Sequence, residues 1–338
     1  MNALGLDIGG ANLKAADSSG NASSEAFEIW RAPGELATRL RELIAWFPAA
    51  GRLAVTMTAE LADCFATKAE GVAFIVGAVR EAAGASPVAI WSTTDEFVSC
   101  ENAIARPMAV AAANWHALAT WVGRLAPRGR ALLIDIGSTT TDVIPMKDGR
   151  PVATGQTDLG RLLNHELVYT GIRRTPLCAL AGAVPIRGLL CPLAAEFFAT
   201  TLDIYLLLGL IPEDPADVTT ADGRPSTIAR AHDRISRMVC CDREEIDLDE
   251  ARSIASYLAQ AQQKLLVSAI ENVSSREAGA LETVILSGSG ELLAHKVVAE
   301  HPLTQHAAIT RLSETLSASV AESACAHAVA VLALELGL

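Results

Sequence analysis

Two segments of the sequence end an apolar run in the same triplet, Asp-Ile-Gly. The first is LGLDIGGANLK at residues 4–14, with its acid at Asp7, and the second is LLIDIGSTTTDV at 132–143, with its acid at Asp135. A strand that ends on an acid and turns on glycine can present backbone N–H groups to a phosphate and a carboxylate to its metal ion. One such segment in each half of the chain predicts a phosphate clamp built from two related domains.

The first segment carries the groups that such a clamp needs. Gly9 and Gly10 let the backbone approach a phosphate closely, and Asn12 and Lys14 add hydrogen-bond donors. Asp7 would hold Mg²⁺ directly or through water. An ordinary hairpin with glycines in its turn is the alternative. The acid at the end of a buried strand favours the functional interpretation, because buried carboxylates are rarely structural without partners.

The second segment places a run of hydroxyl side chains between two acids. Hydroxyls and N–H groups in a turn can chelate terminal phosphate oxygens, Asp135 would be the second Mg²⁺ ligand, and Asp142 would position a metal-bound water. The alternative is a β-branched hairpin in which threonine serves strand propensity. Because a related segment occurs in the first half, we predict that the second also binds phosphate, through Gly137, Ser138, Thr139, Thr140 and Thr141.

A third glycine-containing segment, LSGSGEL at 286–292, follows a predicted strand and opens a predicted helix. Its turn would face a helix N-terminus, which suits the ribose and α-phosphate of a nucleotide, or a diphosphate. Leu293 stands where a dinucleotide fingerprint requires its third glycine, and the sequence has no Gly-Lys pair and so no P-loop. The predicted ligands in this segment are Gly288, Ser289, Gly290 and Glu291.

Two further segments hold candidate side chains for acid–base work and anion binding. Glu60 and Asp63, in TMTAELAD at 56–63, follow a predicted strand, and either could act as a general base. The alternative for both is a solvated helix N-terminus, where acids complement the dipole. Arg173 and Arg174 lie in a loop bounded by glycine and proline and could clamp a diphosphate or a carboxylate, or could be ordinary surface arginines.

The elements that must position these groups alternate between strands and helices. In the first half the pattern predicts strands at 3–8, 13–16, 26–30, 52–57 and 88–91, and helices at 36–44 and 70–83. An alanine-rich helix at 108–124 crosses to the second half. There the prediction is strands at 131–136, 141–146 and 151–154, with an Asp-Gly turn at 148–149, then helices at 159–169, 249–273 and 318–336 and a strand at 283–286.

This order predicts an α/β protein of two domains with mixed sheets that face each other across a central phosphate-binding cleft. We expect the first domain at residues 1–107, a crossover helix and linker at 108–130, and the second domain at 131–338. Residues 171–195 and 212–226 are rich in turn-forming residues and are expected to be insertions in the second domain.

Composition excludes several classes of function. The net charge of −12 argues against nucleic-acid binding, which depends on basic patches. No apolar run reaches the roughly 18–20 residues of a membrane span, and Asp7 interrupts the first one, so we expect a cytoplasmic protein without a membrane partner. Seven cysteines without a C-x-x-C pair, and histidines without H-E-x-x-H spacing, favour neither a disulfide framework nor a zinc site.

In their order along the chain, DIGGANLK, DIGSTTTDV and SGSGE resemble the phosphate 1, phosphate 2 and adenosine motifs of the actin-like ATPase and sugar-kinase superfamily. The second motif looks most like that of the hydantoinase A/oxoprolinase branch. The segments MTAELADCFATKAEGV, RPMAVAAANW, YTGIRRTPLCAL and EFFATTLDIYLLLG resemble a compact group of that branch in the tetrahydromethanopterin-linked one-carbon pathway. This resemblance implies two actin-like, ribonuclease-H-like domains, and it adds Asn114 to the substrate-binding candidates.

The same resemblance implies a transferase of methanofuran biosynthesis. Such an enzyme condenses an aminomethylfuran-methyl diphosphate with the phenol of a tyramine- or tyrosine-type acceptor and releases diphosphate. Its partners would be a phosphorylated small molecule and a phenolic acceptor, with Mg²⁺ as cofactor. Two alternatives stay open: an ATP-dependent kinase or oxoprolinase/hydantoinase-like hydrolase, and a nucleotide-binding regulator without catalysis.

Overall fold

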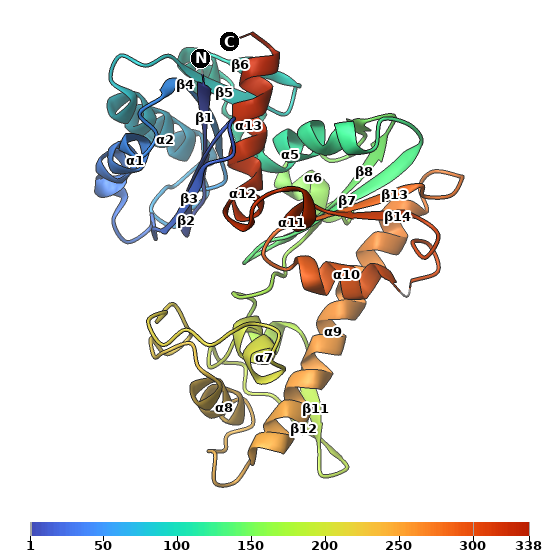
Figure 1. Ribbon diagram of the computed structural model, residues 1–338. Helices are drawn as coiled ribbons and strands as arrows, with labels where there is room; N and C mark the ends of the chain where they lie inside the picture. The colour runs from blue at the N-terminus through green and yellow to red at the C-terminus, as the bar shows by residue number, and fades with distance from the viewer. Residues whose placement is uncertain (1, 300, 338) are drawn as a thin grey trace.

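The computed structural model describes residues 2–299 and 301–337 and contains two large mixed β-sheets (Figure 1). In the first sheet the strand order is β3-β2-β1-β4-β5-β6, and in the second it is β10-β8-β7-β13-β14 with β9 paired to β8. The first sheet comprises β1 Asn2–Ile8, β2 Asn12–Asp17, β3 Ala22–Ala26, β4 Ala50–Met57, β5 Val88–Ser92 and β6 Glu96–Val98. The second comprises β7 Arg130–Ile136, β8 Thr141–Lys147, β9 Arg150–Pro151, β10 Leu167–Val168, β13 Thr283–Ser287 and β14 Ala308–Arg311.

The two sheets repeat the same local connectivity around their central strands. β1 is antiparallel to β2 and parallel to β4, and β7 is antiparallel to β8 and parallel to β13. In each sheet the next strand, β5 or β14, continues the parallel order. The internal repeat expected from the two Asp-Ile-Gly segments is therefore present in the topology, and the prediction of two α/β units with mixed sheets is confirmed.

Helices from both ends of the chain cover the first sheet. α1 Leu36–Ala45 packs against α2 Lys68–Ala83, and the buried face of α2 carries Val72, Ile75, Val76 and Val79, as the sequence pattern predicts. The C-terminal helix α13 Ala324–Glu335 contacts β1, β2 and β4 and packs against α5 Asn114–Val122. The domain boundaries at 107 and 131 stay a prediction; because of these contacts we propose that α13 be counted with the first domain.

A lobe that projects from the second sheet holds most of the remaining chain (Figure 1). We define it as residues 171–247 with the first half of α9 Leu248–Ser274, and it contains both segments that the sequence marks as insertions. Its elements are the hairpin β11 Ala183–Ile186 and β12 Leu189–Pro192, α7 Thr201–Leu207 and α8 Ile228–Arg237. α10 Glu291–Ala299 and α11 Leu312–Thr315 contact β13, and α12 Ala318–Glu322 contacts β3 of the first sheet.

Several element boundaries differ from the prediction. The expected helix at 108–124 is two helices, α4 Pro107–Val110 and α5, because Ala111 is extended and Ala112 has a φ of 47°. The expected helix at 159–169 is α6 Asp158–Leu163, after which β10 pairs with β8. The third strand precedes its predicted position of 26–30, and the last helix is broken at Ser323. Among the described residues, no helix combines the length and apolar character needed to cross a membrane.

Candidate phosphate-binding site

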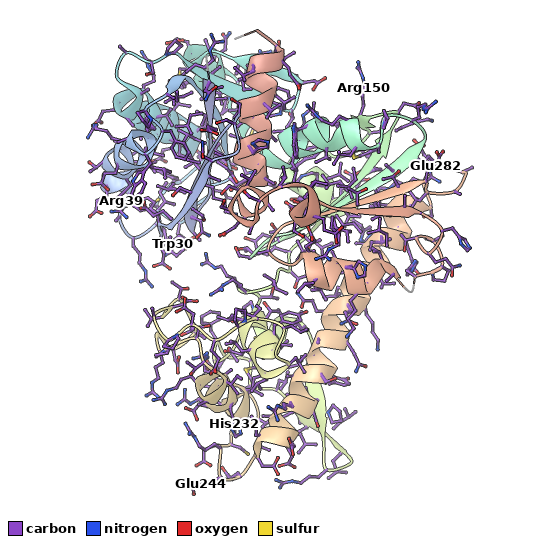
Figure 2. The ribbon with its side chains drawn as sticks, viewed as in Figure 1. Trp30, Arg39, Arg150, His232, Glu244 and Glu282 are labelled. Atoms are coloured by element: carbon purple, nitrogen blue, oxygen red, sulfur yellow. The ribbon has the colours of Figure 1, made fainter. Side chains whose placement is uncertain are left out.

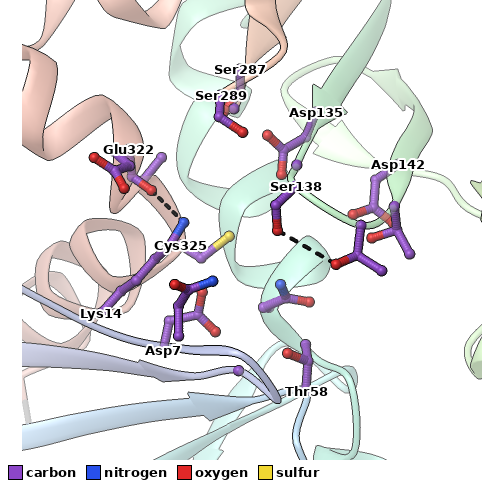
Figure 3. A pocket seen from close by; sticks show the side chains of 18 of the residues that line it. Asp7, Lys14, Thr58, Asp135, Ser138, Asp142, Ser287, Ser289, Glu322 and Cys325 are labelled. Atoms are coloured by element: carbon purple, nitrogen blue, oxygen red, sulfur yellow. Dashed lines mark hydrogen bonds between the residues drawn. The ribbon is translucent and has the colours of Figure 1, made fainter. Parts of the chain in front are cut away.

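A pocket with a cavity volume of about 170 Å³ lies where the β1–β2 turn of the first sheet meets the β7–β8 turn of the second (Figure 3). Its walls contain fourteen of the predicted site residues, so the structure brings most of the candidates together. They are Asp7, Gly9, Gly10, Asn12, Lys14, Asn114, Asp135, Gly137, Ser138, Thr139, Thr140, Asp142, Gly288 and Ser289.

The two turns are built in the same way. The amide of Gly9 donates to the carbonyl of Asn12 at 3.0 Å, and the amide of Gly137 donates to the carbonyl of Thr140 at 2.9 Å. Between these bonds, the amides of Gly10 and Ala11 in one turn and of Ser138 and Thr139 in the other have no backbone acceptor within the described residues. Successive free N–H groups in a turn form a concave anion-binding site. Two such sites facing one pocket can hold the two ends of a diphosphate.

Two buried carboxylates stand beside these turns, one from each sheet (Figure 3). Burial raises the pKa of Asp7 to about 6, and burial together with the neighbouring Asp142 carboxylate raises that of Asp135 to about 6. Oδ1 of Asp7 is buried and has no hydrogen-bond partner in the described part of the chain. Burying a carboxylate oxygen without a hydrogen-bond partner costs free energy, and a bound cation would offset that cost.

The donor set fits Mg²⁺, which prefers oxygen ligands and is usually bound through one or two carboxylates plus the phosphates of a substrate. Asp7 and Asp135 would supply those carboxylates. Within residues 2–299 and 301–337, no group of three or more His, Cys, Asp or Glu side chains is arranged to enclose a metal alone. The site therefore fits a cation that the substrate phosphates help to bind.

The junction of α12 and α13 supplies lining residues that the sequence pattern did not indicate. The ammonium of Lys14 donates to the carbonyl of Glu322 at 2.7 Å, so it is held beside the pocket (Figure 3). Cys325 lines the pocket too, and burial next to the two acids raises the pKa of its thiol. Thr58, which follows β4, completes the wall. No local pattern marks Glu322 and Cys325; only the long-range packing of α13 against β1 places them here. Thr58 is placed by the pairing of β4 with β1.

The third glycine segment contributes only in part. Gly288 and Ser289 line the pocket, whereas Gly290 and Glu291 do not. A Cβ on Gly290 would lie 2.3 Å from Cγ2 of Ile136, so this glycine allows the turn to pack against β7. Oε1 of Glu291 accepts from Nε of Arg311 at 2.9 Å, so this acid stabilises the local fold and is directed away from the pocket. The prediction that Gly290 and Glu291 bind a nucleotide finds no support in their placement.

Replacing Gly288 by Ala should lower the free energy of unfolding by about 2–4 kcal/mol, because its φ is +88° and the added Cβ would lie 2.6 Å from Oδ1 of Asp135. The control is Gly10→Ala, whose Cβ would meet no atom within 4 Å and which should change stability by less than about 1 kcal/mol. Urea unfolding of both variants measures the difference. Equal stabilities would contradict this account of the third segment.

Three other candidates lie outside the pocket. Thr141 is fully buried and its hydroxyl donates to the carbonyl of Thr170 at 2.7 Å, so it does not face a phosphate. Asp63 is exposed on the surface. Glu60 is 1% exposed, and burial raises its pKa to about 7 although the Lys68 ammonium lies 3.8 Å away. Of the two acids predicted as a base, Glu60 is the buried one, and its raised pKa suits proton transfer near neutral pH.

A chain of charges runs from Glu60 to the pocket. Nζ of Lys68 lies 2.6 Å from Oδ2 of Asp158, and Oδ1 of Asp158 lies 3.0 Å from Nη2 of Arg161. The guanidinium of Arg161 also pairs with Asp142, which lines the pocket. The Lys68–Asp158 pair joins α2, on the first sheet, to α6, beside the second. The chain thus connects the two halves of the molecule directly behind the pocket.

The two predicted arginines lie next to the pocket without lining it. The amides of Arg173 and Arg174 both donate to the carbonyl of Ser138 at 3.0 Å. The side chain of Arg173 pairs with Asp217 in the lobe, whereas the guanidinium of Arg174 lies over the ring of Trp30, 5.2 Å from its centre. Arg174 is therefore the arginine that spans the space between the two halves.

Comparison with curated proteins finds two archaeal relatives. One, from Methanocaldococcus jannaschii, is named (4-{4-[2-(gamma-L-glutamylamino)ethyl]phenoxymethyl}furan-2-yl)methanamine synthase; it is 36% identical over 291 residues, which cover 85% of this chain and 86% of the relative. A protein of the same name from Methanococcus vannielii is 33% identical over 201 residues, or 60% of this chain and 89% of that protein.

One solved structure is related in fold. The nucleotide-free structure of an acetone carboxylase aligns with 97% of this chain and 70% of its own, with a TM-score of 0.55 and 9% identity. A ROK hexokinase from Thermus thermophilus aligns over the whole of both chains with a TM-score of 0.45. The hydantoinase/oxoprolinase family matches residues 52–335, most of the chain, including the second phosphate turn and the segment before α13. The chain belongs to the hydantoinase/oxoprolinase family.

Proposed function

We propose that this protein is a transferase of methanofuran-type biosynthesis that joins an aminomethylfuran-methyl diphosphate to a phenol and releases diphosphate. One observation carries the proposal. Two turns with free backbone amides and two buried carboxylates line a pocket that suits a diphosphate and its cation. The names of the archaeal relatives describe a phenoxymethyl-furan product, which is the ether that this reaction would form.

In the proposed reaction the bond between the furan-bearing methylene carbon and the diphosphate oxygen breaks, and a bond between that carbon and the phenol oxygen forms. The bonding pair of the broken bond leaves with the diphosphate, and the phenol proton passes to a base. Bound Mg²⁺ would neutralise charge that develops on the leaving group. The turn amides of Gly10, Ser138 and Thr139 would donate to the same oxygens, and Lys14 would add positive charge beside them.

We propose Glu60 as the base, because an acid with a pKa of about 7 is matched to proton transfer near neutral pH. Oε2 of Glu60 is buried without a hydrogen-bond partner in the described residues, so it can accept a proton. Lys68, which is itself paired with Asp158, would hold the carboxylate in place. Thr58, two residues earlier in the chain, lines the pocket, which supports a position of Glu60 close to it.

The variant Glu60→Gln should reduce kcat about a hundredfold and remove the rise in rate as pH increases through about 7. Gln keeps the size of the side chain but accepts no proton. The matched control is Asp63→Asn, an exposed acid on the same segment, which should keep the wild-type profile. A profile of Glu60→Gln that still rises near pH 7 would exclude Glu60 as the base.

The alternative is an enzyme that spends ATP, since Gly288 and Ser289 line the pocket from the segment that resembles an adenosine motif. The test is to incubate the protein with Mg²⁺ and either ATP or furfuryl diphosphate with tyramine. Release of diphosphate that requires the phenol supports the transferase. ATP hydrolysis without any need for phenol would overturn it in favour of a hydrolase or kinase. Nucleotide binding without turnover of either substrate would indicate a regulator.

A further inference from the structure

An aromatic side chain and an arginine meet across the two phosphate turns. Trp30 follows Ile29, whose amide donates to the carbonyl of Gly10 at 3.1 Å, and Arg174 is bonded through its amide to the carbonyl of Ser138. Gly10 and Ser138 both line the pocket. The contact of Trp30 with Arg174 therefore adjoins the pocket and bridges one turn to the other.

The backbone around this contact is closely packed. A Cβ on Gly171 would lie 2.6 Å from the carbonyl oxygen of Gly137 and from the amide nitrogen of Thr139, so the loop that carries Arg174 rests directly on the second phosphate turn. Trp30 is half-buried and packs in part against the hydrophobic core of the first sheet. Figure 2 shows it on the side of the first half that is turned toward the lobe. Both ends of the contact are thus anchored to the pocket.

The Arg174 side chain has a single partner. It is exposed, and the structure gives it no ion pair or side-chain hydrogen bond among the described residues, in contrast to Arg173, which is paired with Asp217. Its guanidinium lies over the Trp30 ring at 5.2 Å. The ring therefore offers a face that already attracts a planar, delocalised cation.

We infer that Trp30 is the platform for the furan ring of the diphosphate donor, and that Arg174 occupies this face until the donor binds. This inference rests on the proposed function. No aromatic side chain of the described residues lines the pocket, so a ring attached to a bound diphosphate finds its stacking partner just outside it. As the carbon–oxygen bond breaks, the furan shares positive charge, and an indole face stabilises such charge best. The displaced guanidinium is then free to contact the diphosphate.

The test compares the binding of furfuryl diphosphate and of inorganic diphosphate, each with Mg²⁺, by titration calorimetry. Trp30→Leu should weaken furfuryl diphosphate about tenfold and Trp30→Phe about threefold or less, whereas inorganic diphosphate, which has no ring, should bind both variants within about twofold of wild type. The matched control is Trp46→Leu, a tryptophan that is 78% exposed at the end of α1, which should bind both ligands as wild type does.

Unchanged binding of furfuryl diphosphate by Trp30→Leu would overturn the inference, and so would an equal loss for both ligands, which would indicate damage to the phosphate turns. Because the readout is binding, it does not depend on turnover. If wild type binds furfuryl diphosphate but releases no diphosphate with any phenol, the proposed function fails. The role of Trp30 in binding the ring is still tested by comparing the two ligands.

Discussion

Replacing Asp7 by Asn should reduce turnover more than about a thousandfold and at the same time stabilise the metal-free protein above pH 6. The loss of turnover follows from removing a carboxylate that we propose as a Mg²⁺ ligand. The gain in stability follows from the pKa of Asp7, which burial raises from 3.8 to about 6. Between these two values the folded protein retains a proton that the unfolded chain has lost, so stability falls as pH rises through this window.

Above pH 6 the buried charge of Asp7 costs about 3 kcal/mol, which is the shift of roughly two pKa units converted to free energy. Asn has nearly the same shape and carries no charge. The melting temperature of Asp7→Asn in EDTA should therefore exceed that of wild type at pH 8 and match it at pH 4. Addition of Mg²⁺ and diphosphate should raise the melting temperature of wild type and leave the variant unchanged.

Asp63→Asn is the control for charge removal, since this exposed acid lies outside the pocket. It should keep wild-type turnover, the wild-type response to pH and the stabilisation by Mg²⁺ and diphosphate. A destabilised Asp7→Asn at pH 8 would show that the carboxylate is satisfied in a way that its unpartnered Oδ1 does not reveal. Turnover within about tenfold of wild type would refute the metal-ligand role.

The two phosphate turns could be predicted because their information is local. An apolar strand, an acid at its end and a glycine turn are read from eight consecutive residues, and the repetition of this pattern in both halves predicted that the two turns would meet. It was harder to predict which face of the sheet each side chain would occupy. Thr141 was grouped with its hydroxyl neighbours, yet it begins β8, where successive side chains alternate between faces, so Asp142 lines the pocket and Thr141 is buried.

The remaining side chains around the pocket are positioned by long-range packing, which the sequence does not show. Glu322 and Cys325 reach the pocket because α13 returns to pack on the first sheet, more than three hundred residues after β1. Trp30 acquires its partner only through the loop that rests on the second turn. Neither contact has a signature in the residues themselves, since an isolated tryptophan and a lone cysteine are usual components of a core. The sequence thus predicted the two glycine turns that meet at the pocket but not the side chains around them.

Arg161→Met should lower the free energy of unfolding by about 3–5 kcal/mol, the largest effect on stability that we expect in the chain of charges behind the pocket. Arg161 is 3% exposed, pairs with Asp142 and Asp158, and lies 4.8 Å from the centre of the Trp115 ring. Met keeps much of the apolar volume but leaves Asp142 buried without its cation. Chemical denaturation measures the change, and Arg124→Met, which removes an exposed pair with Glu335, should cost less than about 1 kcal/mol.

The double variant Arg161→Met/Asp142→Asn separates electrostatics from packing. If the cost of the single variant comes from the uncompensated carboxylate, removing that charge should restore most of the lost stability; if it comes from lost packing on Trp115, the double variant stays as unstable as the single one. The titration of Asp135 gives a second readout. The Asp142 charge raises the pKa of Asp135, and Arg161 counters that charge. In an NMR titration, Arg161→Met should therefore shift the midpoint of Asp135 to higher pH, and the double variant should return it toward or below the wild-type position.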